Sequence, residues 1–252
     1  MSYLMTKCAR AIQRHGLIGL VKVAATHLVQ FVNNFSPSAR ADTLEREQRC
    51  ALFDKQFGVD TSGYVHYTDL NVESKNQIHA ASYMGSDPKY LREVLGTLPI
   101  DYRNFSLVDF GSGKGRVILL ATEYPFKRIV GVEFSEDLHK IAQENIRRFH
   151  RDRAKCTEVE SIRADAATYA LPNDALVCYF FNPFGATIMS QVLANIEKSL
   201  RQTPREMFVV YANPIEGNLF DRSKSFKKVG ANGPVCIWRA TSEVQSSTDS
   251  KK

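Results

Sequence analysis

The chain has 252 residues, of which 44% are hydrophobic and 24% are charged. These proportions are ordinary for a globular protein and exclude disorder along the whole chain, and the length is ample for one α/β domain with an N-terminal extension. The formal net charge is +6, and most of this positive excess comes from the basic residues that precede the first acidic residue, Asp42. The rest of the chain is closer to balanced, which weakens the case for a nucleic-acid substrate.

The cysteines are odd in number and widely separated. The sequence has no Cys-x-x-Cys pair and no histidine at metal-binding spacing from a cysteine. Because a disulfide framework or a structural zinc site would need such spacing, the pattern predicts a reduced, cytoplasmic protein without a metal.

The N-terminal stretch, residues 17–32, is strongly apolar, but Lys22 interrupts it. A charge in mid-segment argues against a membrane-spanning helix. Three alternatives stay open: a helix that docks on the domain or on a second subunit, an amphipathic helix in an anionic membrane interface, and a targeting peptide. We therefore assign residues 1–41 to a basic, apolar helix followed by a linker, with peripheral membrane contact through residues 1–35 as one of these alternatives.

Helix-capping signals in residues 42–100 predict a helical extension ahead of the first long strand. Asp42 can cap a helix, with Glu45 three residues further on. Asp87 followed by Pro88 marks the start of another helix, since proline is favoured at the first helical position.

A strand, a tight turn and the start of a helix are predicted over residues 106–121. A short apolar run meets glycines at alternate positions, Gly111, Gly113 and Gly115, and an apolar segment free of Gly and Pro follows. Glycines allow backbone N–H groups to approach a ligand closely, and the helix N-terminus offers further N–H groups. The stretch therefore predicts a nucleotide-binding turn.

Of the forms that such a turn can take, two fit poorly. A Walker loop needs a glycine five residues before the Gly113-Lys114 pair, where Val108 stands. The dinucleotide fingerprint places its third glycine three residues after the second, whereas Gly115 follows Gly113 by two. The third form, an acid followed by Gly-x-Gly-x-Gly, matches Asp109 to Gly115 and resembles motif I of the class I S-adenosylmethionine-dependent methyltransferases.

Three further strand-like runs carry polar residues at or near their ends. Residues 128–134 contain Glu133, roughly 20 residues beyond the glycine turn, where a doubly wound fold places the carboxylate that accepts ribose hydroxyls. Residues 159–166 contain Asp165. Residues 175–184 are almost continuously apolar, as is typical of a strand buried on both faces of a parallel sheet, and end in Asn-Pro-Phe.

Strands that alternate with helical patterns predict an α/β fold. We expect a doubly wound, seven-stranded, mostly parallel sheet with helices on both faces, formed by residues 101–240 and preceded by the N-terminal helical extension. The polar residues 241–252 predict a disordered tail.

The resemblance implies S-adenosylmethionine as the cofactor and a role for each of these markers. Glu133 would bind the ribose hydroxyls, and Asp165 with Ala166 would bind adenine. Residues 42–100 would lid the cofactor, with Tyr83 packed on its methionine end, although Tyr83 could also be a half-buried residue of a surface loop. The candidate cofactor-binding residues are Asp109, Gly111, Ser112, Gly113, Gly115, Glu133, Asp165, Ala166 and Asn182, and the candidate catalytic residues are Asn182 and Tyr83.

Asn182 bears on the methyl acceptor. In amino methyltransferases that resemble this chain, Asn or Asp followed by Pro, Pro and an aromatic residue takes the hydrogens of a planar amine, but here Phe184 stands in place of the second Pro, which argues against base methylation. The turn up to Arg116 is similar to that of some protein lysine methyltransferases, which favours an amine such as a protein lysine over a small molecule or a nucleic acid. Asn182 could instead only end its strand, as Asn213-Pro214 does one strand later.

Two other functions stay open. An NAD(P)-dependent oxidoreductase with a Rossmann fold would need different glycine spacing and a proton donor such as Tyr-x-x-x-Lys, which the sequence does not place convincingly. A scaffold that binds S-adenosylmethionine without turnover is the other alternative, and the intact motifs at the strand ends argue against it.

Overall fold

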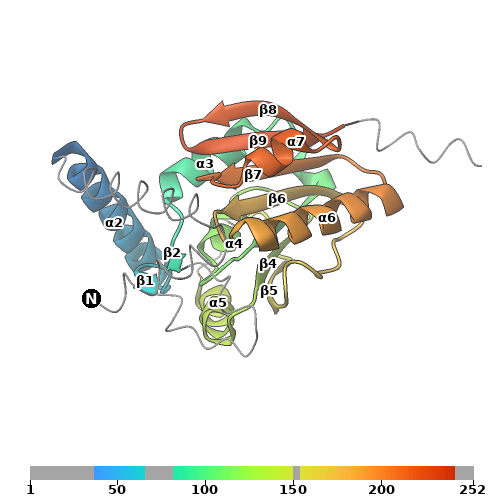
Figure 1. The fold of residues 1–252 in the computed structure, drawn as a ribbon. Helices are drawn as coiled ribbons and strands as arrows, with labels where there is room; N and C mark the ends of the chain where they lie inside the picture. Colours follow the sequence, from blue (N-terminus) through green and yellow to red (C-terminus); the bar gives the residue numbers. More distant parts are fainter. Residues whose placement is uncertain (1–36, 66–81, 150–153, 242–252) are drawn as a thin grey trace, which may run out of the picture. The chain divides into compact units, whose positions relative to one another are not determined.

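The computed structural model describes residues 37–65, 82–149 and 154–241 (Figure 1). The chain divides into two compact units, Met1–Gln48 and Arg49–Lys252. The sheet and every contact discussed below belong to the second unit.

Helix α2 spans Pro37–Phe57, and its residues fall in both units. The sequence analysis placed the start of this helix at Asp42, but the helix begins earlier, at Pro37. Proline is compatible with the first turn of a helix, so Pro37 can begin it. The predictions for residues 1–35 and for the tail beyond residue 241 concern residues outside the described ranges. Among the described residues, no helix combines the length and apolarity needed to cross a bilayer.

The predicted seven-stranded, mostly parallel sheet is confirmed, with the strand order β5-β4-β3-β6-β7-β9-β8. The neighbouring pairs from β5 to β7 are parallel, whereas β9 is antiparallel to β7 and β8 is antiparallel to β9. The strands are β3 (Phe105–Phe110), β4 (Arg128–Glu133), β5 (Val159–Arg163), β6 (Ala175–Phe181), β7 (Met207–Ala212), β8 (Phe226–Asn232) and β9 (Val235–Ala240).

Helices cover both faces of the sheet, as a doubly wound fold requires. Successive strand residues point to opposite faces, so Leu107 joins a core with α3 and α4, whereas Val108 joins a core with α6 and α7. Both side chains are completely buried. In Figure 1, α6 runs in front of the sheet. The helices are α3 (Pro88–Thr97), α4 (Arg116–Ala121), α5 (Glu136–Arg148), α6 (Ala186–Gln202) and α7 (Asn218–Arg222).

Shorter elements precede the sheet in the chain. A two-stranded antiparallel hairpin pairs β1 (Tyr64–Val65) with β2 (Tyr83–Met84), and the 3-10 helix η3 (Tyr102–Asn104) leads into β3. The residues that follow β2 connect it to α3, which Asp87 caps by accepting a hydrogen bond from the Lys89 N–H at 2.9 Å.

The order of the strands fixes where a ligand can bind. β3 lies between β4 and β6, so the chain winds outward on one side of β3 and later on the other side. At such a switch point the connections diverge and leave a crevice beyond the carboxyl ends of the strands. In this chain the crevice lies beyond the ends of β3, β4 and β6.

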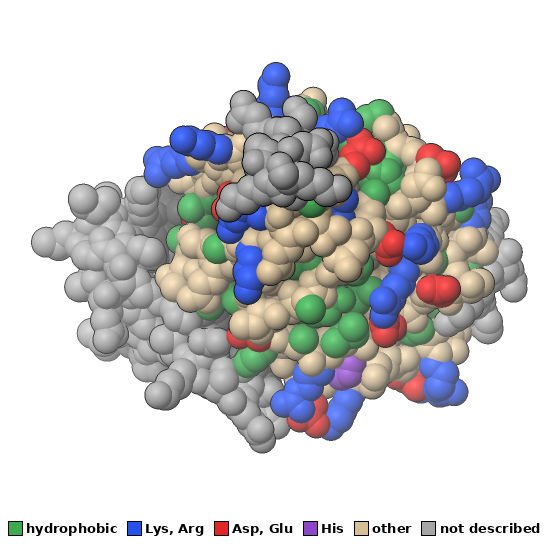
Figure 2. Space-filling view, turned by 90° about the vertical axis from the view of Figure 1, so that its right-hand side faces the viewer, with side chains coloured by type: hydrophobic (Ala, Val, Ile, Leu, Met, Phe, Trp, Pro, Cys, Tyr) green, Lys and Arg blue, Asp and Glu red, His purple; other side chains and the backbone are tan. Residues whose placement is uncertain are grey.

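One face of the molecule shows how the surface charge is arranged. In Figure 2, Lys and Arg side chains are interspersed with Asp and Glu among the described residues. Several of the exposed charges form ion pairs, among them Arg239 of β9 with Glu206 at 2.6 Å. On the described part of that face, basic side chains do not form a continuous track of the kind that follows a nucleic-acid backbone.

Candidate functional site

The glycine turn between β3 and α4 has a left-handed backbone at each glycine. The φ angles are 74° at Gly111, 54° at Gly113 and 87° at Gly115, a region that side-chain-bearing residues rarely adopt. The backbone N–H groups of Gly111 and Ser112 both donate to the Val132 carbonyl, at 2.9 and 3.2 Å. These bonds hold the turn against the end of β4.

The three glycines have different surroundings. A Cβ atom at Gly113 would lie 2.2 Å from the Tyr83 ring, and one at Gly111 would lie 2.5 Å from the Pro183 side chain. Gly115 instead faces Ile118 and Ala142, at 3.2 and 3.3 Å from the position of a Cβ atom. Gly115 therefore serves the packing of α4 against α5.

Ser112 depends on a glycine in the neighbouring strand. A Cβ atom at Gly131 in β4 would lie 2.7 Å from the Ser112 Oγ, so only glycine leaves room for the Ser112 side chain there. Ser112 is buried, and its Oγ has no hydrogen-bond partner among the described residues. A buried hydroxyl without a partner is costly, which is typical of a group that a ligand satisfies.

Two carboxylates lie buried beside the turn. Glu133, at the end of β4, accepts hydrogen bonds from the Gly113 N–H at 2.8 Å and the Ser135 N–H at 2.7 Å. Asp109 is 2% exposed, and its Oδ2 is buried without a partner in the described part of the chain. Burial raises the pKa of both carboxyl groups, and the nearby Glu133 charge raises the pKa of Asp109 further. Such a pair favours a ligand that brings positive charge and N–H or O–H donors.

A cavity opens over these groups at the carboxyl ends of β3, β4 and β6, and residues 82–86, here called the roof, line another side of it. It encloses about 1030 Å³, including its open mouth. Of the residues predicted from the sequence, the structure brings together around the cavity Tyr83, Asp109, Gly111, Ser112, Gly113, Glu133, Asp165, Ala166 and Asn182. Gly115 does not line it.

The segment after β5 presents Asp165 and Ala166 to the cavity. The Asp165 Oδ1 accepts a hydrogen bond from the Ala167 N–H at 2.9 Å, which fixes the carboxylate in a tight turn. Ala166 is 5% exposed. This side of the cavity therefore presents one carboxylate and one small apolar side chain.

Asn182 follows β6 and has an unusual backbone conformation. Its φ angle is 43°, a strained value for a residue that precedes proline. Asn213, which also precedes a proline after the next strand, has a φ angle of 50°. Asn182 lines the cavity, whereas the exposed Asn213 does not. Both asparagines thus have a positive φ angle, but only Asn182 faces the cavity.

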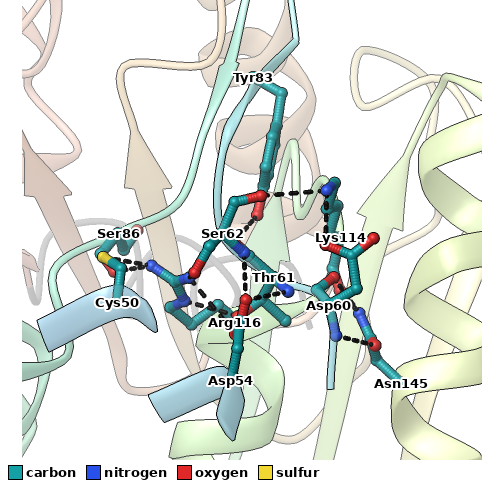
Figure 3. Close-up of polar contacts among 10 residues, drawn as sticks. All are labelled: Cys50, Asp54, Asp60, Thr61, Ser62, Tyr83, Ser86, Lys114, Arg116 and Asn145. Atoms are coloured by element: carbon teal, nitrogen blue, oxygen red, sulfur yellow. Dashed lines mark hydrogen bonds and ion pairs between the residues drawn. The ribbon is translucent and has the colours of Figure 1, made fainter. Parts of the chain in front are cut away.

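The roof is held by a side chain that directly follows the glycine turn, a contact that sequence reasoning did not predict. Arg116, the first residue of α4, is 2% exposed and donates to the Thr61 Oγ1 at 2.7 Å, the Ser62 Oγ at 2.9 Å and the Ser86 carbonyl at 3.1 Å (Figure 3). It also contacts Cys50 and lies 3.6 Å from Asp54. The sequence offered one indication of this role: Arg116 is a basic residue at the start of an otherwise apolar helix.

Two further residues complete this network. The Tyr83 hydroxyl donates to the Thr61 carbonyl at 2.7 Å, and burial raises the Tyr83 pKa, so the phenol keeps its proton. The Lys114 Nζ donates to Asp60 at 2.8 Å and to the Ser62 carbonyl at 3.0 Å. Figure 3 shows Arg116 and Lys114 converging on the same short segment. The turn that faces the cavity therefore also anchors the roof above it.

Comparisons with known proteins bear on this site. A family model described as a methyltransferase domain matches residues 108–205. No curated protein matches the chain. Solved structures similar to this chain include a magnesium protoporphyrin IX methyltransferase from Synechocystis PCC 6803 with bound SAM, which is 16% identical with a TM-score of 0.39 over 61% of this chain and 74% of that one.

Two more of these structures differ in what their names say they act on. A dimethyladenosine transferase from Plasmodium falciparum is 12% identical, with a TM-score of 0.47 over 65% of this chain and 66% of that one. A ribosomal protein L11 methylase from Lactobacillus delbrueckii subsp. bulgaricus is 12% identical, with a TM-score of 0.42 over 63% of this chain and 80% of that one. Such distant similarities identify no acceptor.

The match to the family model covers most of the residues that line the cavity, but not the roof. The matched residues include the glycine turn and the carboxyl ends of β4, β5 and β6. The cavity-lining residues at these places are therefore part of the match. Residues 108–205 of the chain are therefore similar to a methyltransferase domain.

Proposed function

We propose that the cavity binds S-adenosylmethionine against the glycine turn and that the enzyme transfers its methyl group to an amine, with a protein lysine as the favoured acceptor. Asp109 and the turn would hold the methionine portion, Glu133 the ribose hydroxyls, and Asp165 with Ala166 the adenine. Residues 42–100 would contribute the lid, with Tyr83 next to the methionine portion. The observation that carries the proposal is the unpartnered, buried Asp109 Oδ2 beside Glu133.

The residues around the cavity fit this cofactor chemically. S-adenosylmethionine supplies an electrophilic methyl group on a sulfonium, and it also carries an ammonium and a ribose diol. The buried carboxylates of Asp109 and Glu133 suit these cationic and hydroxyl groups, and ionisation of both is favoured when such a ligand is present. Methyl transfer needs little proton transfer, so the chain contributes mainly orientation and exclusion of water.

The side of the cavity around Asn182 supports an amine acceptor. The carboxamide oxygen of Asn182 can accept a hydrogen bond from an amine N–H. Phe181, Phe184 and Ile188 line the same side and make it apolar. An apolar environment lowers the pKa of an amine and so favours the neutral form, whose lone pair can attack the methyl group.

Two measurements test the proposal. Calorimetry should show binding of S-adenosylmethionine and S-adenosylhomocysteine but not of NAD. Incubation with S-adenosylmethionine labelled in its methyl group should then label lysine in proteins of a cell lysate. Binding without transfer to protein, RNA or small molecules would indicate a scaffold, and label in another acceptor would overturn the lysine assignment.

Glu133→Ala is expected to weaken S-adenosylmethionine binding by about 1.5–3 kcal/mol, the scale of a charge-assisted hydrogen bond. The substitution also leaves the buried Gly113 N–H without its acceptor. Calorimetric titration measures the change. Glu160→Ala is the matched control, because Glu160 lies in the neighbouring strand, pairs with Arg128 and does not line the cavity. Equal affinities for the Glu133 variant and the parent would show that the carboxylate does not bind the ligand.

Asn182→Gly is expected to slow methyl transfer by about 10- to 100-fold while the affinity for S-adenosylmethionine stays the same, since it removes the amide that faces the acceptor. Glycine tolerates the φ angle of 43°, so the backbone is preserved. Asn213→Gly makes the same change on the next strand and should leave transfer unaffected. Transfer at the parental rate by the Asn182 variant would assign Asn182 a structural role. The assay is incorporation of labelled methyl groups into lysate protein.

A further inference from the structure

Tyr211 lies behind Asn182, on the neighbouring strand β7. Its ring is completely buried, with centroids 5.7 Å from Phe180 and 6.2 Å from Phe220. The sheet register pairs Tyr211 with Phe180, which comes two residues before Asn182. As a result, the Tyr211 hydroxyl lies 3.4 Å from the Asn182 Oδ1.

The direction of this hydrogen bond follows from the groups that form it. The Tyr211 hydroxyl donates to the Asn182 Oδ1, because a carboxamide oxygen can only accept. Burial raises the pKa of Tyr211 to about 12, so this proton is present at neutral pH. An amide nitrogen cannot accept a hydrogen bond, so the Asn182 carboxamide must turn its oxygen toward Tyr211.

This orientation leaves part of the carboxamide available to a ligand. A carboxamide oxygen has two lone pairs, and Tyr211 uses one of them. Asn182 lines the cavity, so its remaining hydrogen-bonding groups can meet an acceptor there. The distance of 3.4 Å is long for an O–H···O bond, and such contacts often shorten when the reacting complex forms.

We propose that Tyr211 is a positioning residue that fixes the plane and the direction of the Asn182 carboxamide for the methyl acceptor. The inference rests on the proposed function, because it assigns Asn182 to the acceptor. Tyr211 does not line the cavity: it acts through Asn182, and its own position is set by the aromatic core.

Tyr211→Phe tests the proposal, because it keeps the ring and removes only the hydroxyl. We expect transfer of labelled methyl groups to lysate protein to slow by about 3- to 10-fold, the scale of one neutral hydrogen bond, with unchanged affinity for S-adenosylmethionine. In the Asn182→Gly background the same substitution should have no further effect. A general structural role would instead give the same loss in both backgrounds and would overturn the proposal.

Tyr124→Phe is the matched control, because the Tyr124 hydroxyl donates to the Arg92 carbonyl at 2.9 Å and does not line the cavity. A second readout needs no acceptor: in protein labelled with ¹⁵N at asparagine, the Asn182 side-chain signal is the one that Asn182→Gly removes. Tyr211→Phe should shift this signal and Tyr124→Phe should not. An unshifted signal refutes the positioning role, whereas a parent enzyme that transfers no methyl group refutes the proposed function alone.

Discussion

Gly113→Val is expected to abolish measurable binding of S-adenosylmethionine, with a loss of at least about 3 kcal/mol, or about 100-fold in Kd. A Cβ atom at this position would lie 2.2 Å from the Tyr83 ring, so either the turn or the roof must move. The φ angle of 54° adds backbone strain of roughly 1–2 kcal/mol for a residue with a side chain. Calorimetric titration of the purified variant measures the loss.

The same backbone angle occurs elsewhere in the chain without the close contact. Gly233, in the turn between β8 and β9, also has a φ angle of 54°, and nothing lies within 4 Å of a Cβ atom placed there. Gly233→Val therefore carries the strain but should bind the cofactor like the parent. Thermal unfolding of both variants separates lost binding from lost folding. Parental affinity in a folded Gly113→Val protein would show that the ligand does not lie against this turn.

Arg116→Met is expected to lower the free energy of unfolding by about 3 kcal/mol, or the melting temperature by about 10 °C for a domain of this size. The guanidinium is 2% exposed and bonds to Thr61, Ser62 and Ser86 at once, so its removal breaks three hydrogen bonds of a buried cation together. Thermal or urea unfolding followed by circular dichroism measures the change.

Arg92→Met is the matched control for this substitution. Arg92 pairs with Glu123 at 2.6 Å, but its side chain is 42% exposed, and exposed pairs contribute less than about 1 kcal/mol. If the two variants unfold at the same temperature, the Arg116 network does not stabilise the domain. Lower S-adenosylmethionine affinity of Arg116→Met beside an unchanged control would further link the network to the roof.

The sequence predicted the fold and most of the cavity because the required signals are local. Strand runs with acids at their ends can be read residue by residue, and parallel strands bring Asp109, Glu133 and Asp165 to one edge of the sheet without further information. The glycine spacing likewise predicted a tight turn before α4.

Contacts between distant parts of the chain could not be predicted in this way. Arg116 meets Thr61 because of how the segment before the sheet folds back, and Tyr211 meets Asn182 because of the register of β6 and β7. The three glycines of the turn look equivalent in the sequence. Only packing distinguishes Gly115, which faces α5, from the two glycines that face the cavity.

The shared anchorage of the turn and the roof has a thermodynamic consequence. Lys114 lies in the glycine turn and Arg116 directly follows it, and both side chains also hold the segment around Thr61. If the proposed cofactor binds against this turn, loosening that segment should also weaken its binding. On the proposed function, ligand affinity and the rigidity of this segment are therefore linked, and a substitution that lowers one should lower the other.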